Sequence, residues 1–182
     1  MSKRKYCLNI FILLAFIGIC YYISTNEKIT TNDIVTDSFA YSSKTHQIPI
    51  AKLIIKKIGI ENNLYDIGTN ENQVDRNVTI LKESTFPDKE ESILFIAAHS
   101  GEGKIAYFKN LDQLKIKDMA EFIYQGNRYI YEIVNMYERE KNGYIELNKI
   151  SKHQLVLTTC SPKRKGMQLI INAKLIKKEK ID

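Results

Sequence analysis

The stretch Leu155-Val156-Leu157-Thr158-Thr159-Cys160-Ser161-Pro162 joins a strand pattern to a reactive side chain. Its apolar and β-branched residues favour extended backbone, and the run ends in a polar loop. A second apolar run, from Ile93 to Ala98, ends in the same way at His99. A buried strand that runs out into a loop holds a side chain on a rigid support, so Cys160 and His99 are candidates for a reactive site.

A cysteine and a histidine together are suited to nucleophilic thiol catalysis. The imidazole stabilises the thiolate or carries protons, and the thiolate attacks a carbonyl carbon. The other histidines fit less well, because His46 lies in a polar stretch and His153 precedes Cys160 on the same strand by seven residues, or about 23 Å. On spacing alone, a single cysteine at a strand end is more often structural than catalytic, and that alternative stays open.

Further short apolar runs predict a mainly β domain. They are rich in Ile, Val, Tyr and Thr, and Gly, Asn, Asp or Lys separates them. Several such runs in about 130 residues predict an antiparallel barrel or sandwich. We expect hairpin turns at 125–127 and 141–143, and a helical turn or two within 70–77 and 104–111. The runs are Leu53–Ile55, Ile58–Ile60, Phe122–Tyr124, Tyr129–Tyr137 and Leu169–Leu175.

The N-terminal end carries a different signal, an uncharged run from Tyr6 to Ile23 that follows three basic residues. As a helix it reaches about 27 Å, close to the thickness of a bilayer core. A cleaved signal peptide fits less well, because its apolar region is shorter and small residues precede its cleavage site. The basic flank orients the N-terminus to the cytoplasm and the rest of the chain outside. We therefore expect a cytoplasmic segment (1–5), a transmembrane anchor (6–23), an extracellular linker (24–47), a β-barrel domain (48–178) and a tail (179–182).

The net charge of +6 belongs mostly to the two ends of the chain. Residues 3–5 contribute +3 and residues 174–182 contribute +2, which leaves +1 for everything else. The domain therefore offers no electrostatic reason to bind nucleic acid. Cys7 and Cys20 fall in the expected anchor, so Cys160 has no disulfide partner in the outer domain. No metal-ligand spacing or phosphate-binding glycine pattern occurs, and we expect no cofactor and no metal.

Four motifs in order resemble those of the sortases, the cysteine transpeptidases of Gram-positive cell surfaces. Leu157-Thr158-Thr159-Cys160 resembles their T-L-x-T-C signature, and Ala97-Ala98-His99-Ser100 resembles their A-G-H block. The stretch 108–118 is similar to F-x-x-L-x-x-L-x-x-G-D, with Lys117 in the glycine place. Residues 55–60 resemble the early I-P-K-I-x-I strand, with Lys56 where proline is usual.

This resemblance implies a closed eight-stranded β-barrel with one or two short helices, preceded by a single N-terminal transmembrane helix. It also implies that Cys160 attacks the Thr–Gly bond of an LPXTG-like sorting signal and forms an acyl-thioester. His99 would protonate the departing amine and then assist an incoming amine of the peptidoglycan precursor. The implied partners are surface proteins that carry such a signal, met by an enzyme anchored in the cell membrane with its catalytic domain outside.

One position departs from the sortase pattern. Sortases carry a catalytic arginine that opens the strand after the cysteine, and aligning that strand on 169–175 places Gln168 there. Three hypotheses follow from the exchange. Gln168 serves as a neutral hydrogen-bond donor to the developing oxyanion, Arg164 swings in from the loop, or the activity is weak or lost.

The remaining candidates have weaker support. Thr158 and Thr159 would shape the substrate groove, although threonine in a strand is ordinarily just a good β-former. Glu102, Glu138 and Glu140 could in principle build the calcium site that some sortases use, but exposed acidic residues are far commoner than metal ligands, and we expect no such site. The alternatives to a transpeptidase are a sortase-shaped peptide-binding module without turnover and a hydrolytic cysteine peptidase, in which water replaces the amine.

Overall fold

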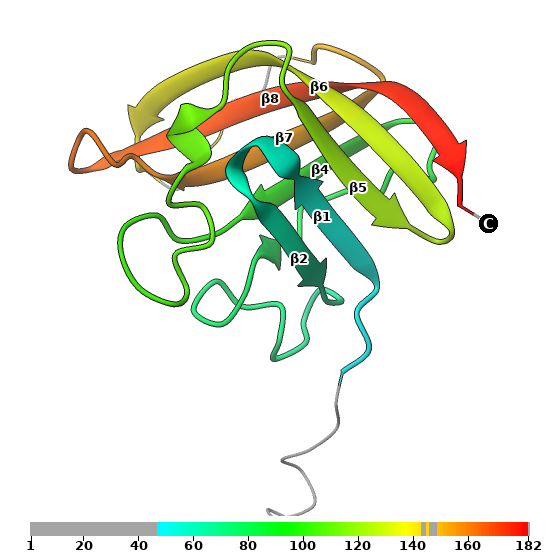
Figure 1. Cartoon of the computed structure of the whole chain (residues 1–182), viewed down its shortest axis with the longest axis horizontal. Coiled ribbons are helices and arrows are strands. Elements are labelled where there is room, and N and C mark those ends of the chain that lie inside the picture. The colour runs from blue at the N-terminus through cyan, green and yellow to red at the C-terminus, as the bar shows by residue number, and fades with distance from the viewer. Residues whose placement is uncertain (1–46, 143–144, 146–148, 182) are drawn as a thin grey trace, which may run out of the picture. The chain divides into compact units, whose positions relative to one another are not determined.

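The computed structural model describes residues 47–142, 145 and 149–181, and their fold is mainly β (Figure 1). Eight strands belong to one sheet, and two 3-10 helices connect parts of it. The strands are β1 (Ala51–Ile55), β2 (Ile60–Leu64), β3 (Thr79–Ile80), β4 (Ser92–Ala97), β5 (Met119–Tyr124), β6 (Asn127–Glu140), β7 (His153–Cys160) and β8 (Met167–Lys180). The 3-10 helices are η1 (Lys56–Ile58) and η2 (Leu111–Gln113).

The sheet curls into a nearly closed barrel in the order β2-β1-β5-β6-β8-β7-β4-β3. Its longest pair, β6 with β8, has register shifts near Ile130 and Ile133, where the extra residues bend the ladder. Figure 1 shows these two strands curving side by side over the rest of the sheet. The eight strands and the few helices match the prediction. Among the described residues, however, no ladder joins the edge strands β2 and β3, so the barrel is not fully closed as the resemblance implied.

The core lies on the inner face of the curved sheet. Alternate residues of β1 and β4 are buried, as expected for strands with one face toward a core. Leu53, Leu94 and Phe122 expose none of their surface, and burying each such side chain contributes about 1.5–3 kcal/mol. Strand β7 differs, because all its residues from Gln154 to Thr159 are buried. Burial on both faces accounts for the continuous apolar run Leu155-Val156-Leu157.

The two predicted hairpins had different outcomes. The turn between β5 and β6 is confirmed, and Gln125 and Gly126 both have positive φ, 47° and 69°. Two such residues match the twist of the flanking strands. The turn expected at 141–143 does not join β6 and β7 as a hairpin, because both strands pair with β8 instead. Gly143 itself lies outside the described residues.

The predicted transmembrane anchor at 6–23 lies outside the described residues. Within the part of the chain that the structure describes, no helix is long and apolar enough to cross a membrane.

Lys117 has a backbone conformation that L side chains rarely adopt. Its φ is 75°, and its N–H donates to the Ile133 carbonyl oxygen at 2.8 Å. The next residue, Asp118, binds Lys57 Nζ at 2.6 Å and the Lys115 N–H at 2.6 Å. The hydrogen bonds of Lys117 and Asp118 therefore fix the turn. They hold Lys117 in the left-handed region, where its Cβ is in steric conflict with the backbone.

We predict that Lys117→Gly stabilises the protein, since glycine has no Cβ to clash in this conformation. The gain is expected to be about 0.5–1 kcal/mol, after the larger chain entropy of glycine in the unfolded state is subtracted. Urea unfolding followed by circular dichroism measures it. Lys117→Ala is the matched control, because it removes the charge and keeps the Cβ. A gain for alanine equal to that for glycine would contradict the assignment to backbone strain.

Candidate active site

The site forms where two parallel strands end together. Strand β4 pairs in parallel with β7, and the last pair in register is Ala97 with Thr158. His99 and Cys160 each follow two residues later, so they leave the same edge of the sheet on adjacent strands. Neighbouring strands lie about 4.8 Å apart, which brings the two backbones within reach of one another's side chains. The two residues predicted to react are thus brought together by the fold.

Three hydrogen bonds bind the chain around His99 to the chain around Cys160. Thr159 Oγ1 donates to the Ala98 carbonyl oxygen at 2.7 Å, and the Ala98 N–H donates to the Thr158 carbonyl oxygen at 3.4 Å. Ser100 Oγ donates to the carbonyl oxygen of Cys160 at 2.7 Å. These bonds flank both candidate residues, so neither backbone can shift without the other.

Both threonines are buried, one on each face of β7. Thr158 is 7% exposed and Thr159 is 5% exposed. Thr158 Oγ1 donates to the Leu169 carbonyl oxygen at 3.1 Å, which ties β7 to β8. Both hydroxyls therefore serve the framework of the site, and a contact of these side chains with substrate stays a prediction.

His99 has a second set of supports. The Phe108 N–H donates to the His99 carbonyl oxygen at 2.9 Å, and Phe108 itself is fully buried in the core. On the side-chain end, His99 Nε2 lies 2.8 Å from Asp75 Oδ1. Asp75 belongs to the loop between β2 and β3 and is exposed. The imidazole is thus oriented by a carboxylate while remaining accessible to solvent, as a group that exchanges protons requires.

Cys160 is an exposed free thiol with a cation beside it. Gln168 on β8 is its partner in the antiparallel ladder, and Arg139 on β6 is in turn the partner of Gln168. Residues directly opposite in a ladder share a face, so the three side chains start from the same side of the sheet. Beyond the end of β6, Lys141 Nζ donates to Cys160 Sγ at 3.5 Å.

Arg164 is engaged away from the cysteine. Its Nε donates to Glu138 Oε2 at 2.5 Å, and Ser161 Oγ donates to Glu138 Oε1 at 2.6 Å. The hydrogen bond from Ser161, and then that from Arg164, lowers the pKa of the Glu138 carboxyl. Glu138 precedes Arg139 on β6, so it starts from the opposite face to Cys160. Arg164 therefore anchors the β7–β8 loop in this structure.

No group of three or more His, Cys, Asp or Glu that could hold a metal ion occurs among the described residues.

Asp75 and Lys141 are the two site residues that sequence reasoning missed. Asp75 stands 24 positions before His99, in a polar loop without periodicity. Lys141 stands 19 positions before Cys160, where the sequence indicated only a turn. Neither belongs to a spacing pattern with its partner. The one available signal for Lys141 was indirect. Because Gln168 stands where sortases carry an arginine, a positively charged side chain from another part of the chain could be expected beside Cys160.

We predict that Thr159→Val lowers the free energy of unfolding by about 1–3 kcal/mol. Valine matches threonine in shape, but it leaves the buried Ala98 carbonyl oxygen without its donor. Chemical denaturation measures the change. Thr159→Ser keeps the hydroxyl and loses only a methyl group, so it should cost less than the valine variant. If serine costs as much as valine, the hydrogen bond is not what ties β4 to β7.

Comparisons with known proteins agree with this geometry. A family model described as a sortase domain matches residues 53–176. Among solved structures, sortase C of Streptococcus pneumoniae matches with 23% identity and a TM-score of 0.60, over 74% of this chain and 71% of that chain. Sortase E1 of Streptomyces coelicolor, solved with a tripeptide in its active site, matches with 17% identity and a TM-score of 0.60, over 72% of this chain and 90% of that one.

A lid mutant of sortase A from Corynebacterium diphtheriae matches with 21% identity and a TM-score of 0.60, over 75% of this chain and 74% of that one. No curated protein matches the chain. At these identities the structural matches establish the shared fold, and the domain model establishes the family. The chain that carries Cys160 and His99 at the ends of β7 and β4 belongs to the sortase family.

Proposed function

We propose that this protein is a membrane-anchored cysteine transpeptidase that cleaves an LPXTG-like sorting signal and transfers the acyl group to a cell-wall amine. The observation that carries the proposal is the exposed Cys160 thiol at the end of β7, beside His99 at the end of β4, within a sortase domain. A thiol that only fills space is usually buried in the core. Cys160 is instead exposed, directly after the buried run from Gln154 to Thr159.

The first half of the reaction uses Cys160 as the nucleophile. The thiol proton goes to His99, and the sulfur attacks the scissile carbonyl carbon to form a C–S bond. The C–N bond then breaks, the amine leaves with a proton from His99, and an acyl-thioester remains on Cys160. In the second half, an incoming amine loses a proton to His99 and displaces the sulfur. One amide exchange is thereby divided into two easier acyl transfers.

Gln168 is assigned the position that an arginine holds in the resemblance. Its place opposite Cys160 in the β7–β8 ladder supports that alignment. The side-chain amide can donate a hydrogen bond to the developing oxyanion, although it carries no charge. Arg164 is assigned to the loop, because its guanidinium already donates to the Glu138 carboxylate. Ser161 donates to the other oxygen of the same carboxylate.

The cellular setting is part of the same proposal. The uncharged run 6–23 and its basic flank support a single anchor with the N-terminus in the cytoplasm and the catalytic domain outside. The substrates would be surface proteins with an LPXTG-like signal, and the acceptor an amine of the peptidoglycan precursor. The near-neutral charge of the domain favours no nucleic-acid partner.

The direct test is a quenched-fluorescence peptide assay with the full chain in detergent. Peptides carry varied LPXTG-like signals, and each is incubated with and without hydroxylamine or a candidate acceptor amine. We expect cleavage by the wild type, an amine-dependent product, and loss of both in Cys160→Ala and His99→Ala. The single-pass anchor does not need to span a bilayer for this readout.

The other outcomes identify the alternatives. If the amine neither accelerates cleavage nor is incorporated into the product, the protein is a hydrolytic cysteine peptidase. Peptide binding that survives Cys160→Ala, without turnover by the wild type, would make it a binding module. His153→Ala is the matched control, because His153 begins β7 and binds Ser92 far from the thiol.

A further inference from the structure

A lysine lies against the cysteine sulfur and has no part in the mechanism above. Lys141 follows β6, and its Nζ donates to Cys160 Sγ at 3.5 Å. Its backbone N–H donates to the Gly166 carbonyl oxygen at 2.9 Å, which extends the pairing of β6 with β8 by one residue. Lys141 is therefore positioned by the sheet, at the edge where β7 ends.

We propose that Lys141 is a catalytic residue that supplies, from the end of β6, the positive charge that Gln168 does not bring to β8. The proposal deepens the proposed function and rests on it for the oxyanion, while the thiolate interaction is independent of any substrate. An ammonium in contact with the sulfur stabilises the thiolate, and charge-assisted hydrogen bonds are roughly twice as strong as neutral ones.

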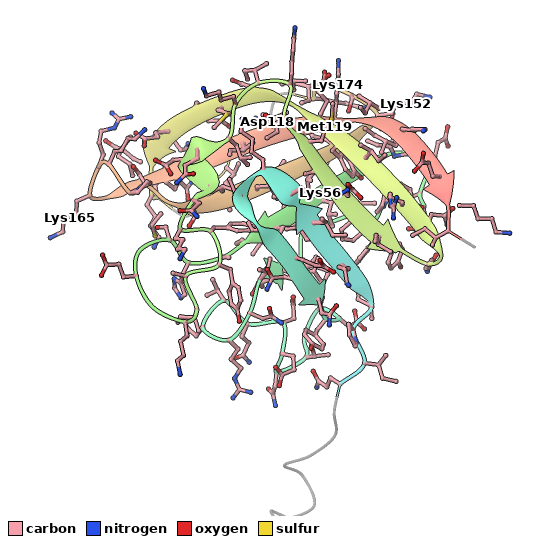
Figure 2. The ribbon with its side chains drawn as sticks, in the orientation of Figure 1. Lys56, Asp118, Met119, Lys152, Lys165 and Lys174 are labelled. Carbon is pink, nitrogen blue, oxygen red and sulfur yellow. The ribbon has the colours of Figure 1, made fainter. Side chains whose placement is uncertain are left out.

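The neighbouring cations are committed elsewhere or lie farther away. Arg164 binds Glu138, and Lys163 Nζ lies 3.6 Å from Asp112 Oδ2. Lys165 extends from the tip of the β7–β8 loop, as Figure 2 shows. Arg139 stands one strand beyond Gln168, so Gln168 separates it from Cys160 in the ladder. Lys141, by contrast, donates to the sulfur itself, at 3.5 Å.

The same ammonium can stabilise the negative charge as it passes from the sulfur to the carbonyl oxygen in the first step. As the sulfur attacks, the C–S bond forms and the carbonyl π electrons move to the oxygen. That oxygen sits on the carbon bonded to Sγ, so a donor in contact with Sγ is within reach of it. When the C–N bond breaks, the carbonyl re-forms and the amine takes its proton from His99. Lys141 keeps its own proton throughout and has three donors to share between sulfur and oxygen.

The test begins with a reaction that needs no peptide. The full chain is alkylated with iodoacetamide at neutral pH, and mass spectrometry follows the fragment that carries Cys160, which separates it from Cys7 and Cys20. We expect Lys141→Gln to slow alkylation about tenfold and Lys141→Arg to keep most of the rate. Lys165→Gln is the matched control, with the same change of charge on the exposed loop, and should react like the wild type.

The second arm measures peptide cleavage. Lys141→Gln should lower kcat/KM by about a hundredfold, in the range of a lost oxyanion donor. Gln168→Arg added to Lys141→Gln should restore at least tenfold, because it returns a cation to the strand opposite Cys160. An alkylation rate that does not change in Lys141→Gln would overturn the proposal. So would a loss of alkylation and cleavage that occurs in Arg139→Gln and not in Lys141→Gln. If the wild type cleaves no peptide but alkylation still depends on Lys141, the proposed function fails and the thiolate contact stands.

Discussion

The parallel pairing of β4 with β7 is the constraint on which the candidate site depends. Parallel strands end at the same edge, so a residue just past each end is presented to the same region of solvent. Here those residues are His99 and Cys160. The pairing of β4 with β7 alone would leave His99 on a loop, whereas Cys160 is the last residue of β7 and also pairs with Gln168 on β8. The Thr159 hydroxyl on the Ala98 carbonyl and the Ser100 hydroxyl on the Cys160 carbonyl extend the connection past the last ladder pair. The backbones that carry the two candidate side chains are therefore held to one another.

The strand order explains why a positively charged side chain beside Cys160 can come from either of two strands. Strand β8 lies between β7 and β6, so the end of β7, the start of β8 and the end of β6 meet at one edge. A cation beside Cys160 can come from β8, where Gln168 stands, or from the end of β6, where Lys141 stands. An arginine and a lysine are not equivalent in that role, because the guanidinium binds with a planar fork and the ammonium as a compact point charge. In our proposal, Gln168 offers a neutral hydrogen-bond donor from β8, and Lys141 adds the positive charge and further donors from the end of β6.

Much of the fold followed from the sequence because its signals are local. The run before Cys160 predicted a buried strand, and the turn at 125–127 predicted a hairpin, since both depend on residues adjacent in the chain. The I-x-K-I-x-I resemblance also marked the right place, although residues 56–58 form the 3-10 turn between β1 and β2 instead of a strand. The features that the sequence did not predict depend on contacts between residues far apart in the chain. The turn at 141–143 looked like a hairpin because nothing in the residues reveals that β8 inserts between β6 and β7. The contacts of Asp75 with His99 and of Lys141 with Cys160 likewise join residues far apart in the chain.

The central claim is that Cys160 becomes acylated during the reaction. Its most direct test is the intact mass of the full chain, quenched in acid during incubation with a cleavable LPXTG-like peptide. The account predicts a species heavier by the N-terminal acyl fragment, located on Cys160, that disappears on treatment with hydroxylamine and is absent from Cys160→Ala. Peptide turnover with no such species under any quench time, or an acyl group located on another residue, would contradict it.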